Sequence, residues 1–168
     1  MIEFSWDAVR RARQLKTSVT LPCCREELFD FFSDAFQLER ITPPWLNFRI
    51  LTSAPIEIQP GALIDYKLRL RGLPIRWRTE ISQWDPPCSF VDRQIKGPYL
   101  LWEHRHTFEQ TDDGTIVADT VHYRVPGGAL VDRLFIQKEL RRIFQYREDQ
   151  MLKIFGTPTN QHLETAKR

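Results

Sequence analysis

The chain has 168 residues, which fits one domain, and a hydrophobic content of 42% is enough for a sizeable core. Its 24 basic and 22 acidic residues leave a net charge of +2, too small to predict binding to nucleic acid or to an anionic membrane. No apolar run reaches the roughly 18 residues of a transmembrane helix, and no signal-peptide pattern occurs, so the cytoplasm is the expected compartment.

The first part of the chain predicts one strand followed by two short helices. Residues 1–13 predict an arm or a short helix, since they are basic and only thinly apolar. Apolar and polar residues alternate over 14–21, which is typical of a half-buried strand. Helical spacing then predicts a helix over 26–34 and a further turn over 36–41, which the prolines at 43–44 terminate.

The middle of the chain predicts a series of antiparallel strands. Alternating residues are separated by short segments that contain Pro, Gly or Asp, as in successive hairpins. Together with the strand over 14–21, this gives about six to seven strands. The segments of this series are 48–51, 64–70, 75–81, 89–95, 100–109 and 115–125.

The last part of the chain predicts one long amphipathic helix over residues 129–155. At the standard rise this helix spans nearly 40 Å, roughly the width of a sheet. The polar segment 157–168 has no period and predicts a disordered tail, so 14–156 form the expected ligand-binding domain. The apolar stripe of the helix consists of Leu134, Ile136, Leu140, Ile143, Phe144, Met151, Ile154 and Phe155.

The three cysteines predict neither a disulfide framework nor a zinc site. Cys23 and Cys24 are adjacent, which is not the CxxC spacing of redox or metal motifs, and Cys88 is far away in the sequence. We expect reduced, buried thiols.

The order of elements predicts an α+β fold, because strands are grouped and do not alternate with helices. A strongly bent antiparallel sheet curls away from a straight helix, so the long helix cannot fill the whole concave face. The space that remains is the predicted apolar pocket.

The chain resembles the START-like superfamily, also called SRPBCC. The resemblance rests on the element order and on the local stretches 29–32, 41–44, 102–108 and 119–127. It implies a helix-grip fold with a ligand between the sheet and the long helix. The superfamily includes polyketide cyclases and aromatases, pollen-allergen-like carriers and lipid-transfer domains, and it shares no single catalytic motif, so the resemblance leaves the activity open.

Polar residues occur on strand faces that are otherwise apolar and therefore predicted to be buried. Period-two counting places His104 and His106 on the same face as Trp102, and Asp119 on the same face as Tyr123. The segment 89–95 adds Asp92 if its residues 90, 92 and 94 face the same way. Two imidazoles and one or two carboxylates are therefore expected among large apolar neighbours.

The long helix contributes one charge to its apolar stripe. Arg147 lies between Phe144 and Met151 and is expected to pair with Asp119 or Asp92. Three roles remain open for this group of polar residues: a buried network in which they satisfy one another's hydrogen bonds, the orientation of a ligand's polar end, or acid/base catalysis. The candidates for catalysis are His104, His106 and Asp119.

No metal or cofactor is expected. His104 and His106 lie about 6.5 to 7 Å apart at their Cα atoms, close enough to share an ion. However, no cysteine or third histidine has the spacing to complete a site. The outer basic stripe over 67–78 is interpreted as a solvated face or as a contact for an acidic protein or a phosphate.

Three functions remain open: a carrier or sensor of a small hydrophobic molecule, a cyclase-like enzyme, and a protein-interaction domain with a vestigial pocket. The expected partner is the small hydrophobic molecule, and the oligomeric state stays open. The aromatic members of the site are expected in the core or against the ligand. The predicted ligand-binding residues are Tyr66, Trp77, Asp92, Trp102, His104, His106, Asp119, Tyr123, Phe144, Arg147 and Met151.

Overall fold

The computed structural model describes residues 1–156, in which one antiparallel sheet of eight strands wraps around a long C-terminal helix. The order of the strands in the sheet is β1-β2-β8-β7-β6-β5-β4-β3. The strands are β1 (Glu3–Asp7), β2 (Ala12–Leu21), β3 (Arg49–Ile50), β4 (Leu63–Leu70), β5 (Leu73–Asp85), β6 (Ser89–Lys96), β7 (Leu101–Thr111) and β8 (Gly114–Arg124).

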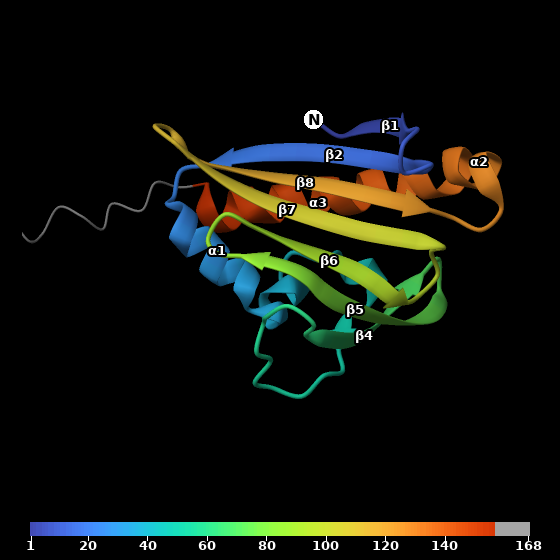
Figure 1. Ribbon diagram of the computed structural model, residues 1–168, viewed down its shortest axis with the longest axis horizontal. Coiled ribbons are helices and arrows are strands. Elements are labelled where there is room, and N and C mark those ends of the chain that lie inside the picture. Colours follow the sequence, from blue (N-terminus) through green and yellow to red (C-terminus); the bar gives the residue numbers. More distant parts are fainter. Residues whose placement is uncertain (157–168) are drawn as a thin grey trace, which may run out of the picture.

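The helices lie on one face of this sheet (Figure 1). The longest, α3, runs behind β2, β8 and β7, and α1 lies at the end of the sheet where α3 terminates. The structure confirms the predicted α+β helix-grip fold, with eight strands where six to seven were expected. The helical elements are α1 (Arg25–Ser33), α2 (Gly128–Val131), α3 (Gln137–Phe155), the 3-10 turns η1 (Ala35–Glu39) and η2 (Pro44–Leu46), and the π-helical turn η3 (Asp132–Ile136).

The additional strand comes from the N-terminal segment, where the prediction of an arm or a short helix is wrong. Residues 3–7 form β1, which pairs antiparallel with β2 after a turn that contains Arg11 at positive φ. Ile2 is buried and Phe4 packs beside it against β8 and α3. A strand this short buries too few apolar residues to give a clear alternation in the sequence.

The C-terminal helix is interrupted, whereas the sequence predicted one uninterrupted helix. At η3 the backbone N–H of Gln137 donates to the carbonyl oxygen of Asp132, five residues earlier. The extra residue in this turn rotates the preceding segment relative to α3, so Leu134 is exposed and does not belong to the apolar stripe. Asp132 is instead buried, where Arg13 Nε lies 3.1 Å from its carboxylate and Gln137 Nε2 donates to it.

Three hydrophobic clusters hold the layers together and surround the interior. One packs α1 against β7 and the C-terminal end of α3 through Phe29, Phe108 and Phe155. A second packs the first half of α3 on β2 and β8, and a third lies on β4 and β5 around Trp77. The long helix covers one half of the sheet most closely, and the interior space lies over the other half.

The cysteines differ from the prediction in their burial. All three are free, but Cys24 and Cys88 are exposed and Cys23 is only half-buried. The expectation of buried thiols is therefore wrong, because the residues lie at the ends of β2 and β6 and not within the core. Within residues 1–156, no helix is long and apolar enough to cross a membrane. The predicted tail 157–168 lies outside the described residues.

The turn between β7 and β8 depends on Gly114. Its φ of +125° disfavours a side chain, and a Cβ atom there would lie 2.1 Å from the carbonyl oxygen of Leu21. Gly72, in the turn between β4 and β5, also has a positive φ but no atom within 4 Å of a Cβ position. Substitutions at the two glycines therefore separate the cost of backbone strain from the cost of steric overlap.

We expect Gly114→Ala to lower the free energy of unfolding by more than about 2 kcal/mol, because it combines strain with a clash against backbone. Gly72→Ala is the control and should cost only the strain, about 1 kcal/mol. Urea denaturation of both variants measures the difference. Equal losses would show that the contact with Leu21 does not constrain this turn.

Candidate functional site

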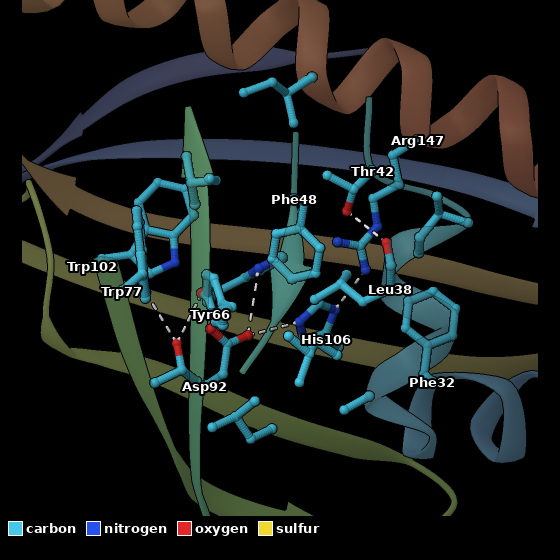
Figure 2. Close-up of a pocket in the computed structure, with 18 of the residues that line it drawn as sticks. Phe32, Leu38, Thr42, Phe48, Tyr66, Trp77, Asp92, Trp102, His106 and Arg147 are labelled. Atoms are coloured by element: carbon cyan, nitrogen blue, oxygen red, sulfur yellow. Dashed lines mark hydrogen bonds and ion pairs between the residues drawn. The ribbon is translucent and has the colours of Figure 1, made fainter. Parts of the chain in front are cut away.

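A cavity of about 210 Å³ lies between the sheet and the helices. Strands β4 to β7 form one side, α1 with η1 and η2 closes one end, and α3 lies opposite (Figure 2). An apolar cavity of about 150 Å³ holds benzene, so this one accommodates a molecule somewhat larger than a single aromatic ring. Most of the predicted ligand-binding residues line it: Tyr66, Trp77, Asp92, Trp102, His104, His106, Phe144 and Arg147.

The other predicted residues do not line the cavity, and the prediction is wrong for their position. Asp119 and Tyr123 lie on β8, where α3 covers the sheet directly, and both are buried. Met151 packs in the cluster between α1 and the end of α3. Only Asp119 still reaches the site, through contacts with side chains that do line the cavity.

The sequence did not identify much of the apolar lining. Several of these side chains come from the helical segments before β3. This part of the chain shows helical spacing but has no polar residue on its apolar face that would indicate a site. Hydrophobic residues of this kind cannot be distinguished from core residues by their pattern. The lining residues missed in this way include Phe31, Phe32, Leu38, Ile41, Thr42, Leu46 and Phe48, and on the strands Ile64, Leu68, Thr79, Ile81 and Phe90.

Two imidazoles lie side by side between two carboxylates at one wall of the cavity. His104 Nε2 and His106 Nδ1 each lie 2.9 Å from the same oxygen, Asp119 Oδ1. On the other side, Asp92 Oδ2 lies 3.0 Å from His106 Nε2 and 3.6 Å from His104 Nδ1. The strand register explains this arrangement, since Asp119 is opposite His106 and Asp92 is opposite His104.

Arg147 extends the cluster from α3. Its Nη2 lies 3.8 Å from Asp119 Oδ1 and 3.4 Å from His106 Nδ1, which confirms the predicted proximity to Asp119. The guanidinium lies over the ring of Phe32, with its central carbon 5.1 Å from the ring centroid. Among the described residues, its buried Nε has no hydrogen-bond partner. Figure 2 shows Arg147 and His106 facing each other across the cavity wall.

Burial and neighbouring charges set the protonation of the cluster. Burial alone would raise the pKa of Asp119, but Arg147 and the two histidines hold it well below its ordinary value. Burial and the neighbouring His106 lower the pKa of His104. Burial also opposes charge on His106, but hydrogen bonds to Asp119 and Asp92 outweigh it and raise the pKa of His106.

The polar groups at another part of the cavity wall already satisfy one another. Thr79 Oγ1 accepts a hydrogen bond from Trp77 Nε1 at 3.1 Å and lies 3.1 Å from Tyr66 Oη. Burial raises the pKa of Tyr66, so its phenol stays neutral. The Asp92–His106 side is therefore where the cavity presents a charged group.

Trp45, on η2, packs outside the cavity. Its ring lies edge-on to Tyr146 of α3, with ring centroids 5.5 Å apart, and Arg142 covers it. Its neighbour Leu46 is the residue of η2 that lines the cavity. Trp45 therefore attaches η2 to the long helix.

A bent sheet that encloses a cavity under one long helix defines the helix-grip fold of the START-like superfamily. Residues 22–151 match the family described as polyketide cyclase / dehydrase and lipid transport. This match spans more than half of the chain, and the chain belongs to this family. No match was found among curated proteins.

Solved structures share the fold at low sequence identity. Protein Ms6760 from Mycobacterium smegmatis has a TM-score of 0.67 and 16% identity, over 92% of this chain and 97% of that one. A protein from Arthrobacter aurescens has a TM-score of 0.68 and 12% identity, over 96% and 98%. Major latex-like protein 151 from Panax ginseng has a TM-score of 0.60 and 13% identity, over 83% and 97%. These similarities establish the fold alone.

We expect Arg147→Leu to lower the free energy of unfolding by about 3 to 5 kcal/mol, because it leaves the buried carboxylate of Asp119 without its cation. Arg142→Leu is a control on the same helix. Its side chain is 57% exposed and faces Glu139, so its loss should cost less than about 1 kcal/mol. Urea denaturation measures both, and a variant at Arg147 as stable as the parent would contradict the dependence of Asp119 on this arginine.

Proposed function

We propose that this protein binds one small hydrophobic molecule in the cavity, as a carrier or sensor. The observation that supports this most directly is the apolar space itself, bounded by aromatic side chains from the sheet and the helices. Well-packed interiors leave few voids larger than a water molecule, so a cavity of about 210 Å³ is a costly feature in a domain that binds nothing.

The lining favours a ligand with an apolar body and one polar end. Trp77, Phe48 and Leu68 offer an extended apolar surface, while Asp92 and His106 form the charged part of the wall. A hydroxyl or amine donor on the ligand finds an acceptor in Asp92. Lipids, polyketides and isoprenoid-like molecules of modest size have this combination of properties.

A cyclase-like enzyme is the second candidate, and the Asp92–His106 pair is the observation that favours it. A histidine that lines a cavity and contacts a carboxylate at 3.0 Å can take or give a proton. The carboxylates also orient the ring, as an acid/base catalyst requires. By contrast, a protein-interaction domain with a vestigial pocket needs no cavity, and the size of this one counts against that function.

We further propose the cytoplasm as the compartment. Cys24 and Cys88 are exposed and unpaired, and exposed thiols persist most readily where reductants keep them from oxidising.

We expect Ile143→Trp to weaken binding of the neutral naphthalene dye prodan at least about tenfold, because the indole fills part of the cavity. Ile143 lines the cavity from α3, whereas Leu152 lies on the same helix, is 43% exposed and does not line it. Leu152→Trp is therefore the matched control and should bind like the parent. A fluorescence titration reports the dissociation constants. Unchanged affinity of Ile143→Trp would show that the dye binds elsewhere.

We also expect native mass spectrometry of protein purified from its own host to show one bound organic molecule per chain. A hydrophobic carrier retains its ligand through purification when dissociation is slow. Protein that is ligand-free in every preparation and that also fails to bind prodan would contradict the proposed function.

A further inference from the structure

Three ligand-type side chains converge on one point of the cavity wall. One ring nitrogen each of His104 and His106 and a carboxylate oxygen of Asp92 all lie within 4.8 Å of one another. They come from adjacent strands, β6 and β7, so a continuous part of the sheet fixes their backbones. All three residues line the cavity.

Asp119 determines which ring nitrogens face this point. His104 Nε2 and His106 Nδ1 both lie 2.9 Å from Asp119 Oδ1, and a ring that donates its N–H to that carboxylate leaves its opposite nitrogen free to bind an ion. In a neutral imidazole the opposite nitrogen then carries a lone pair. These opposite nitrogens, His104 Nδ1 and His106 Nε2, are the ones that face Asp92.

In this tautomer, two lone pairs and a carboxylate oxygen point toward one another, and a cation between them removes the repulsion. Without an ion, His106 Nε2 hydrogen-bonds to Asp92 Oδ2 at 3.0 Å. A proton on His106 satisfies one of the two contacts with Asp92. A divalent ion satisfies both contacts at once and leaves both N–H groups on Asp119. Metal-bound histidines commonly donate their second ring nitrogen to a carboxylate in this way, which fixes the ring and strengthens it as a ligand.

Two of the three separations are close to those around a first-row transition ion, and all three lie within 4.8 Å. Bonds of about 2.0 to 2.2 Å in a tetrahedral site separate neighbouring ligand atoms by about 3.3 to 3.6 Å. The corresponding separations here are 3.0 Å for His106 Nε2 to Asp92 Oδ2 and 3.6 Å for His104 Nδ1 to Asp92 Oδ2. The two ring nitrogens lie within 4.8 Å of each other, so side-chain rotation must bring them closer before all three atoms bind one ion.

We propose that Asp92, His104 and His106 bind a divalent first-row transition ion, such as Zn²⁺, at the wall of the cavity. Two histidines and one carboxylate leave at least one coordination position free, as in metal sites that hold a water or a substrate. Since all three ligands line the cavity, this position faces the space in which the hydrophobic molecule is proposed to bind. An oxygen of that molecule, or a water, completes the coordination.

The sequence predicted no metal site because no cysteine or further histidine has a suitable spacing from His104 and His106. That prediction did not consider Asp92 as a third ligand. Asp92 is 12 positions before His104 in the sequence but directly opposite it in the paired strands. The carboxylate therefore becomes visible as a ligand only once the register of β6 and β7 is known.

The test is a Co²⁺ titration of the full chain after treatment with a chelator. We expect one equivalent to bind with the visible absorption of a four- or five-coordinate ion, and Zn²⁺ to displace it. Asp92→Ala and the isosteric Asp92→Asn should both weaken binding at least about tenfold, the lower end of the loss seen even for residues that only support a metal ligand. Asp92 is partly exposed to the cavity, so both variants should fold, and circular dichroism verifies this.

The matched control is His122→Gln. His122 Nε2 lies 3.2 Å from Asp7 Oδ2, which makes a histidine–carboxylate pair without a second histidine. This variant should bind Co²⁺ within about twofold of the parent. Absence of a stoichiometric visible spectrum, or equal affinity in both Asp92 variants and the parent, would overturn the proposal and leave a proton as the only cation at this point. Prodan binding in metal-free buffer is measured separately, so failure of the metal site does not affect the test of the cavity.

Discussion

The buried carboxylate of Asp119 is the constraint around which the site is organised. A buried carboxylate with a 3% exposed side chain is costly unless its charge is compensated, and three side chains compensate it: the imidazoles of His104 and His106, each 2.9 Å away, and the guanidinium of Arg147. These contacts fix the position of both rings and determine what they present to the cavity. A core residue that the ligand cannot touch therefore controls the chemistry of the wall that it does touch.

The cavity combines this charged wall with a much larger apolar surface, and the fold explains why both coexist. The bent sheet follows α3 closely over β2 and β8, so apolar packing there is dense. Over β4 and β5 the sheet curves away from the helix, and aromatic rings such as Tyr66 and Trp77 border the space without filling it. The charged residues lie on β6 and β7, where these two regions meet. A bound molecule would thus contact apolar rings along its length and a polar group at one side.

Sequence patterns predicted the element order, the helix-grip fold and the polar residues of the site, because alternation in β7 and β8 is strong and the polar residues interrupt it. His104, His106 and Asp119 face inward as predicted. The sequence patterns gave wrong predictions where an element is too short to show a pattern, or where a change in helix geometry alters the helical periodicity. The first strand is too brief to show alternation, and the π-helical turn rotates Leu134 out of the apolar stripe. The detailed contacts of Asp92 depend on strand register, which a single sequence does not specify.

The sheet order has a consequence for how the molecule is made. β2 leaves the ribosome before β3 to β7, yet its inner neighbour is β8, which follows all of them. Until then β2 keeps an open edge toward the sheet, and α3 cannot dock on a surface that does not yet exist. The nascent chain therefore has no enclosed interior while its N-terminal half emerges. The cavity therefore forms only after β8 and α3 are made, and pairing between strands that are distant in the sequence predicts slower folding than in a helical bundle.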